Sequence, residues 1–102
     1  MAENKHQKYV ELVNEVLDAV KAAKNLKTDT ELAAEIGEHK VDISKYRKGT
    51  RVISDWKLLR LVKIADMDRL DAFKKIILYK SLKKEVEEVI QDFIDLLSQD
   101  KK

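Results

Sequence analysis

The chain has 102 residues, of which 44% are hydrophobic and 39% charged, a composition that suits one compact domain with an appended element. It has no cysteine, which excludes disulfides, a thiolate nucleophile and a cysteine-based zinc site. The formal net charge is only +2, but residues 38–63 hold eight Lys or Arg against three Asp or Glu. This local excess of positive charge is the distribution expected of a surface that meets a phosphate backbone.

The absence of proline and the presence of only two glycines predict an almost wholly helical protein. The first eight residues, M-A-E-N-K-H-Q-K, lack the apolar core of a signal peptide. No run approaches the roughly 18 apolar residues of a membrane span. We therefore expect a cytoplasmic protein that does not enter a membrane.

The first predicted helix runs from Lys8 to about Lys24, after a polar segment, residues 1–7, that we expect to be frayed. Apolar residues recur through it at spacings of three and four, which is the pattern of an amphipathic helix. They are Tyr9, Val10, Val13, Val16, Leu17 and Val20. This helix should lie in the core.

A second helix should begin after Thr28, because Thr28 and Glu31 have the spacing of a capping box. It should end at Gly37, which can adopt the left-handed conformation without steric penalty. The helical period then restarts, with Val41 or Ile43 facing inward together with Tyr46, and stops at Gly49. Two helices this short need a larger helical domain around them.

The segment L-A-A-E-I-G-x5-I-S-K-Y-R-K-G resembles the lambda-repressor-like, Cro and XRE type of helix-turn-helix. In that family a small residue lies in the first helix, a glycine in the turn, and Ile or Val followed by Ser and basic residues in the second helix. The matching positions are Ala33, Gly37, Ile43, Ser44 and Gly49. The resemblance covers about half the chain, extends loosely to near Met67 and implies a DNA-binding domain with the helix-turn-helix motif at residues 28–49. With the fifth helix described below, we expect a five-helix domain over residues 1–79.

Two positions depart from the family pattern. Glu38 follows the turn glycine where the family usually has an apolar residue, so we expect this part of the turn to be open to water. Asp29 stands where the family often places Gln or Ser against a phosphate. Because a carboxylate there would repel DNA, the phosphate contact should pass to Thr28, Thr30 or backbone amides.

The resemblance also implies which side chains meet DNA. Those facing the bases are His39, Lys40, Val41, Asp42 and Lys45. Those meeting phosphates are Thr28, Thr30, Ser44, Lys48, Thr50 and Arg51. Lys40 and Lys45 suit guanine O6 and N7, and Asp42 suits the amino group of cytosine. Val41 suits a thymine methyl group unless it is partly buried.

After the motif, Ser54 is a favourable N-cap for a helix from Asp55 to about Ala65. Ile53 and Leu58 have the spacing of a hydrophobic staple across this helix start. Trp56 either lies half-buried against the motif or reaches a partner.

A fifth helix should begin near Arg69 and bury the stripe of Leu70, Phe73 and Ile77. The nearby aspartates, Asp66, Asp68 and Asp71, lack the spacing of a calcium loop and are expected to be helix caps and first-turn residues.

The C-terminal residues 80–102 carry an apolar stripe with the alternating spacing of a coiled-coil seam. Its members are Leu82, Val86, Val89, Ile90, Phe93, Leu96 and Leu97. We expect an extra amphipathic helix that pairs with a second copy, with folding back onto the same chain as the alternative. Whether residues 68–98 form one helix or two stays open.

No catalytic, metal-binding or cofactor-binding motif is recognisable, so we expect neither enzyme activity nor a cofactor. His39 lies alone, without another His or Cys at ligand spacing, and no metal site is expected. The sequence favours a homodimeric transcriptional regulator of the phage, plasmid or mobile-element kind, binding a palindromic double-stranded operator. The alternatives are an antitoxin-like protein whose C-terminal helix holds a protein partner, with DNA binding for autoregulation, and a helical scaffold with a degenerate motif.

Overall fold

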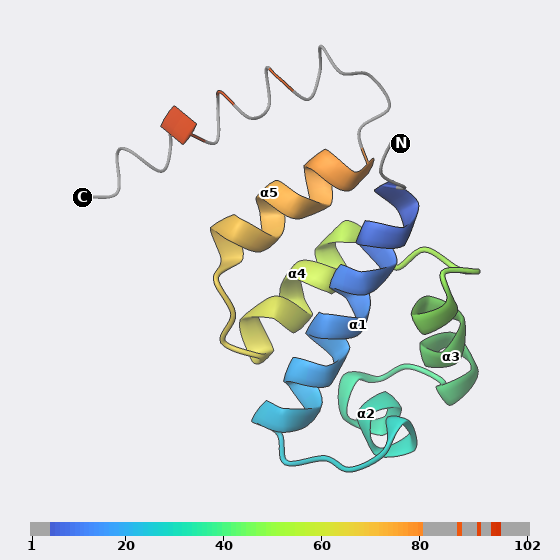
Figure 1. The fold of residues 1–102 in the computed structure, drawn as a ribbon. Coiled ribbons are helices and arrows are strands. Elements are labelled where there is room, and N and C mark those ends of the chain that lie inside the picture. The colour runs from blue at the N-terminus through green and yellow to red at the C-terminus, as the bar shows by residue number, and fades with distance from the viewer. Residues whose placement is uncertain (1–4, 81–87, 89–91, 93–94, 97–102) are drawn as a thin grey trace.

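The computed structural model describes residues 5–80 together with residues 88, 92, 95 and 96. All regular structure in this part of the chain is helical, and residues 5–80 form five helices (Figure 1). They are α1 (Lys5–Ala23), α2 (Asp29–Ile36), α3 (Lys40–Lys48), α4 (Asp55–Ile64) and α5 (Arg69–Lys80). The prediction of an all-α protein is confirmed for the described residues.

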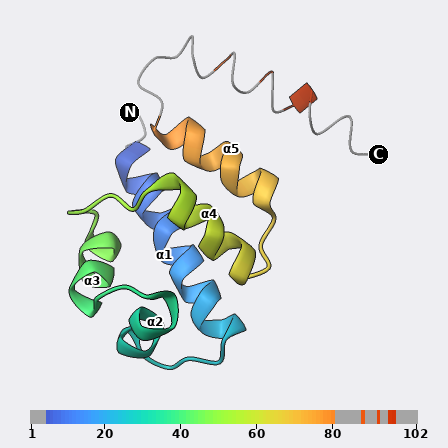
Figure 2. The ribbon, with the colours of Figure 1, turned by 180° about the vertical axis from the view of Figure 1, so that it is seen from behind.

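Helix α1 is the centre of the domain, because it packs against each of the other four helices (Figures 1 and 2). Val16, Leu17 and Val20 on its inner face have no exposed surface. Each such side chain contributes roughly 1.5–3 kcal/mol by leaving water. Helix α1 therefore supplies more of the buried core than any other helix in the described part of the chain.

The start of α1 differs from the prediction, because residues 5–7, expected to be frayed, belong to the helix. The reason lies elsewhere in the chain. The imidazole of His6 and the side chain of Val10 lie against the backbone at Gly49, where α3 ends. A polar segment can continue a helix when a neighbouring element packs on it.

The buried face of α5 is not the predicted one. Ala72 and Ile76 are buried in the core, whereas Phe73 keeps 37% of its surface exposed. Leu70 and Ile77 are only half-buried. The sequence of α5 contains two apolar stripes, and α5 packs on α1 and α4 through the one that includes the small Ala72.

Helix α4 begins where expected, and Ile53 and Leu58, the two residues of the predicted staple, are both buried. Ser54 occupies the N-cap position, but its hydroxyl makes no capping hydrogen bond. The Ser54 Oγ is buried and has no hydrogen-bond partner among the described residues. The predicted capping role of this hydroxyl is therefore wrong, although the helix boundary is right.

Most of the predicted dimerisation stripe lies outside the described residues. This applies to Leu82, Val86, Val89, Ile90, Phe93 and Leu97. Leu96 is described, and 57% of its surface is exposed. Whether residues 68–98 form one helix or two also falls outside the described part.

The hydroxyl of Tyr9 ties α1 to the segment before α4 by donating a hydrogen bond of 3.0 Å to the carbonyl oxygen of Ile53. Burial, together with the negative charge of Asp55, raises the pKa of Tyr9 to about 12. The hydroxyl therefore stays protonated and remains a donor over the whole range in which the protein is handled.

Replacing Tyr9 by phenylalanine should lower the free energy of unfolding by about 1–2 kcal/mol, because the buried carbonyl of Ile53 loses its donor. Urea unfolding followed by circular dichroism measures this change. Tyr79→Phe is the matched control, since the Tyr79 hydroxyl makes no hydrogen bond within the described residues. Equal losses in the two variants would contradict the assigned role of the Tyr9 hydroxyl.

Candidate nucleic-acid interface

Helix α2 begins with the predicted capping box. The Thr28 Oγ1 accepts a hydrogen bond of 3.1 Å from the Glu31 amide, and the Glu31 carboxylate accepts one of 3.0 Å from the Thr28 amide. It also accepts one of 2.8 Å from the Lys27 amide. These backbone donors lower the pKa of Glu31. The start of α2 is therefore fixed by local sequence alone.

The turn between α2 and α3 is centred on Gly37, whose φ of 72° is left-handed, as predicted. Glu38 follows, and its side chain is only 15% exposed, so the expectation that this position opens to water is wrong. Its carboxylate accepts a hydrogen bond of 3.0 Å from the Tyr46 hydroxyl and pairs with Lys57 at 3.2 Å. These two contacts hold the Glu38 side chain against α3 and α4.

Helix α3 has one buried face and one open face. Ile43 and Tyr46 are buried in the core. On the open face Lys40 and Lys45 are exposed, and Val41 exposes 62% of its surface. The inward-facing alternative for Val41 is thereby excluded. His39 precedes the helix as an exposed N-cap without a side-chain capping bond.

Arg47, one residue after the buried Tyr46, is turned into the protein and joins three helices. Its guanidinium donates to the Asp29 carboxylate at 2.8 and 3.0 Å, to the Asn14 side-chain oxygen at 2.8 Å and to Asp18 at 2.8 Å. The Asn14 amide group donates in return to the Arg47 carbonyl at 3.0 Å. We call these four residues, Asn14, Asp18, Asp29 and Arg47, the Arg47 cluster.

The Arg47 cluster compensates the negative charge of Asp29, which was expected to repel DNA. Hydrogen bonds from the Arg47 guanidinium are the largest influence on Asp29 and, helped by Lys21 at 3.3 Å, they lower the pKa of its carboxyl group. The carboxylate is ionised but compensated by two cations. It is therefore a weaker obstacle to an approaching phosphate than the sequence suggested.

Asp42 and Arg51, predicted to meet a base and a phosphate, contact each other across the side of α3. The Arg51 Nη1 lies 2.6 Å from the Asp42 Oδ1. The second carboxylate oxygen of Asp42 has no partner in the described part of the chain. This ion pair holds the loop after α3 against the side of the helix.

The remaining residues predicted to contact phosphates differ in exposure and in whether their side chains already form hydrogen bonds. Thr28 is exposed, but its hydroxyl is used in the capping box, whereas Thr30 is exposed and forms no side-chain hydrogen bond in the described structure. Thr50 donates to the Lys45 carbonyl at 3.4 Å. Lys48 is exposed and Ser44 is half-buried.

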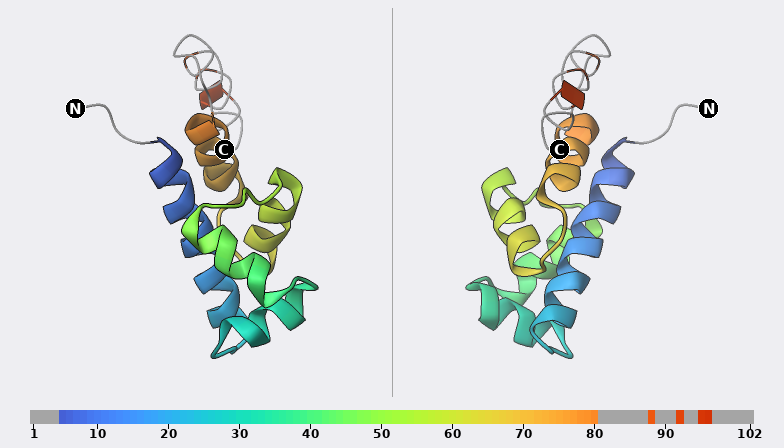
Figure 3. Two further views of the ribbon diagram at one scale, coloured as in Figure 1. Left: turned by 90° about the vertical axis from the view of Figure 1, so that its right-hand side faces the viewer. Right: turned by 90° about the vertical axis from the view of Figure 1, so that its left-hand side faces the viewer.

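Three of the eight cations in residues 38–63 pair with acidic groups, namely Arg47, Arg51 and Lys57. The other five have no acidic partner among the described residues. They are Lys40, Lys45, Lys48, Arg60 and Lys63. Three of these five lie on α3 and two on α4. Figure 3 shows α2 at the end of the domain away from α5, with α3 beside it. Within residues 38–63, the cations without an acidic partner therefore all lie on α3 and α4.

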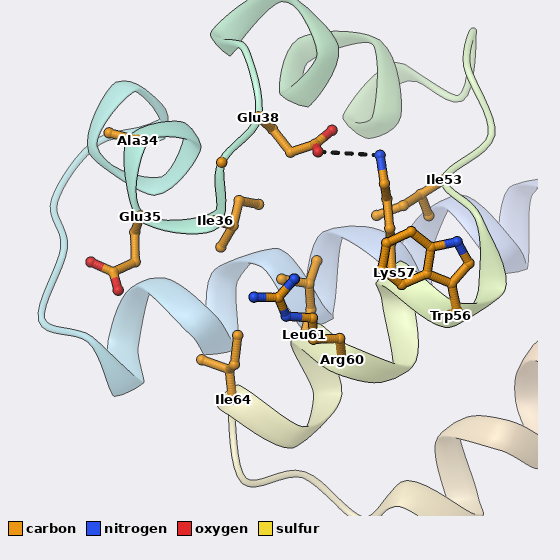
Figure 4. A pocket seen from close by; sticks show the side chains of 11 residues that line it. Ala34, Glu35, Ile36, Glu38, Ile53, Trp56, Lys57, Arg60, Leu61 and Ile64 are labelled. Carbon is orange, nitrogen blue, oxygen red and sulfur yellow. Dashed lines mark hydrogen bonds and ion pairs between the residues drawn. The ribbon is translucent and has the colours of Figure 1, made fainter.

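A groove of about 510 Å³ lies between the C-terminal part of α2 and one side of α4 (Figure 4). Ile36, Ile53, Leu61 and Ile64 form its apolar floor, with Trp56 and Arg60 at its rim. We call it the α2–α4 groove. Trp56 is 63% exposed, which is more than the half-burial considered from the sequence.

Asp68, one of the acidic residues that follow α4, caps the next helix. The Asp68 Oδ1 accepts hydrogen bonds from the amides of Leu70 at 3.0 Å and Asp71 at 3.1 Å, which caps the start of α5.

Within the described residues no group of three or more His, Cys, Asp or Glu is arranged to hold a metal ion. No helix in the same part of the chain has the length and apolar character needed to cross a membrane.

Sequence reasoning missed the role of Arg47, which it counted only as one more cation of the basic segment. A signal was present, because Arg47 follows Ile43 by four residues and so lies on the same side of α3. It also missed Arg60 as a rim residue, for which local sequence offers no signal.

Comparison of the chain with models of known protein families, with curated proteins and with solved structures gave no match.

Proposed function

We propose that this protein is a sequence-specific double-stranded DNA-binding regulator with a lambda-repressor-like helix-turn-helix fold, in which α2 and α3 are the two motif helices. The observation that carries the proposal is the open face of α3. It presents unpaired lysines to solvent, while Ile43 and Tyr46 anchor the opposite face. A helix anchored in this way is narrow enough to enter the major groove.

In this proposal the side chains at the start of α3 read the bases. Lys40 and Lys45 donate to guanine, and Val41, exposed and apolar, contacts a thymine methyl group. The free oxygen of Asp42 accepts from a cytosine amino group, while its other oxygen holds Arg51 beside the helix. His39 lies at the entry of the same face.

Phosphate contacts surround this face. Lys48, Thr50 and Arg51 lie at the end of α3 and in the following loop, and Thr30 lies in the first turn of α2. The amides of Lys27, Thr28 and Glu31 are used in the capping box, which leaves those of Asp29 and Thr30, at the positive end of the helix dipole, to meet an anion. Compensation of Asp29 by Arg47 and Lys21 makes this approach feasible.

A single domain offers few contacts, so we propose that two copies bind a palindromic operator with half-sites about 34 Å apart. The C-terminal segment is the proposed pairing element. Repression of transcription, as in small phage or plasmid regulators, is the mode of action that we propose.

To test the proposal, operator DNA is first selected from a random pool, and Kd is then measured for Lys40→Ala and Lys45→Ala over a range of salt concentrations. Each substitution should raise Kd by about tenfold to a hundredfold and relax selection at one base pair, because a base contact contributes about 1–3 kcal/mol. Lys48→Ala should instead reduce the salt slope by about one and leave the selected sequence unchanged.

Lys74→Ala on α5 is the control, because it removes a positive charge far from α3 in sequence, and it should leave the Kd nearly unchanged. All variants are compared by circular dichroism to exclude unfolding. Wild-type affinity and an unchanged salt slope in both α3 variants would exclude DNA reading by this helix.

A further inference from the structure

The α2–α4 groove has an unfilled apolar floor and a charged rim. Two cations line its α4 side, but they are not equivalent. Lys57 is paired with Glu38 at 3.2 Å, and its Nζ lies 5.9 Å from the centre of the Trp56 ring. Arg60 is exposed and has no acidic partner among the described residues. Figure 4 shows its guanidinium lying over the groove. Glu35 and Glu38 line its α2 side, and because Lys57 neutralises Glu38, Arg60 is the lining cation left without an acidic partner. An occupant that fits the α4 side therefore combines apolar side chains with a carboxylate for Arg60.

The C-terminal part of this chain has that chemistry. Residues 85–100 contain six Asp or Glu, no Lys or Arg, and seven large apolar residues. Where the structure describes this segment, Glu88, Asp92 and Asp95 are exposed, and so is Leu96. Its acidic, apolar character complements both the floor of the groove and the positive charge of residues 38–63.

The arrangement of the domain favours a second copy as the source of this segment. Helix α5 ends at Lys80, at the end of the domain opposite to α2 (Figures 1 and 2). In the single chain Leu96 remains largely exposed and does not line the groove. We propose that the α2–α4 groove binds the C-terminal segment of a second copy, reciprocally, with Arg60 facing its carboxylates and the apolar floor receiving its apolar side chains.

This inference rests on the proposed pairing of two copies, but it does not depend on DNA binding, and its tests contain no DNA. Failure of the pairing mode would appear here, whereas failure of DNA reading would appear only in the α3 variants.

Trp56 is the only tryptophan of the chain, so its fluorescence reports on the rim of the groove directly. Emission and mass by light scattering are measured together over a range of protein concentrations. We expect the emission to shift to shorter wavelength in step with formation of the dimer. A dimer that leaves Trp56 emission unchanged would indicate pairing of the C-terminal segments with each other and would overturn the proposal. A monomer at all concentrations would overturn it too.

Complementation between two variants gives the sharper test. Arg60→Glu alters the groove and Leu96→Asp alters the C-terminal segment, and each alone should weaken self-association at least tenfold. A mixture of the two should associate more tightly than either variant, because an intact segment meets an intact groove in the mixed pair. Lys63→Glu, on α4 but outside the groove, is the matched control and should associate like the wild type.

Three outcomes contradict the proposal. If Leu96→Asp weakens association but Arg60→Glu does not, the C-terminal segments pair without the groove. If the mixture associates no better than the separate variants, the groove and the segment do not form a reciprocal contact. If the groove binds only a different protein, neither variant changes self-association. Circular dichroism of each variant confirms that the fold is retained.

Discussion

Replacing Arg47 by methionine is expected to lower the free energy of unfolding by about 2–3 kcal/mol at neutral pH. Breaking a buried ion pair by removing one partner costs roughly 3–5 kcal/mol, and partial exposure reduces this figure. The Arg47 side chain is 20% exposed and that of Asp29 28%. Methionine keeps the apolar stem but leaves Asp18 and the Asn14 oxygen without the Arg47 donor, and it leaves Asp29 with Lys21 as its remaining cation. Urea unfolding followed by circular dichroism measures the loss.

The deficit of Arg47→Met should also depend on pH. Because Arg47 lowers the pKa of Asp29 in the folded protein, the contact stabilises at pH values above the pKa of an unfolded aspartate, about 3.9. Its contribution begins to fall as the pH drops below that value, and it is lost fully only when the pH has passed through the lowered pKa of Asp29 in the folded protein. The stabilities of wild type and variant should therefore converge as the pH is lowered below about 3.9.

Lys48→Met is the matched control for Arg47, because Lys48 is the next residue of α3, is exposed and has no acidic partner within the described residues. It should change stability by less than about 0.5 kcal/mol. Similar losses at positions 47 and 48 would contradict the structural role assigned to the Arg47 cluster. Comparing the two variants also separates the effect of losing a structural contact of α3 from the effect of removing one of its exposed charges.

Gly49→Ala should destabilise the protein by about 2–4 kcal/mol, through left-handed strain of about 1 kcal/mol and overpacking of about 1–3 kcal/mol. Its φ is 78°, and a β-carbon at this position would lie 2.6 Å from Val10 Cγ2 and 3.0 Å from His6 Nε2. The same urea titration measures the change. The stiff valine side chain has little freedom to move away.

Gly37→Ala isolates the strain from the crowding. Gly37 has a similar φ of 72°, but a β-carbon there would meet nothing within 4 Å. Its loss should be only about 1 kcal/mol. If the two alanine variants lost the same stability, the close approach of α1 to the end of α3 would not matter energetically.

The boundaries of α2 and α3 were predictable because local residues determine them. Thr28 with Glu31 predicted the start of α2, and the glycines at positions 37 and 49 predicted the ends of α2 and α3, which the structure confirms. The inward direction of Tyr46 followed from helical spacing and is likewise confirmed. Features that depend on a few adjacent residues can be derived from the sequence.

Features that depend on distant partners could not be derived in this way. Arg47 meets Asn14, 33 residues earlier, and Glu38 meets Lys57, 19 residues later. Helical spacing places Arg47 on the side of Ile43, but no local pattern identifies its partners, and none distinguishes Glu38 from a solvated charge. In α5, two stripes have helical spacing, and only packing against α1 decides that Ala72 and not Phe73 is buried. Whether α3 reads DNA stays a prediction.

Helix α3 has one side that packs in the domain and one side that is exposed to solvent. Ile43, Tyr46 and Arg47 hold the domain together, whereas Lys40 and Lys45 form no side-chain hydrogen bond or ion pair with the rest of the described structure. Substitutions on the outer side therefore leave folding almost untouched. The outer side of α3 can therefore change in sequence while the scaffold that carries it keeps its packing.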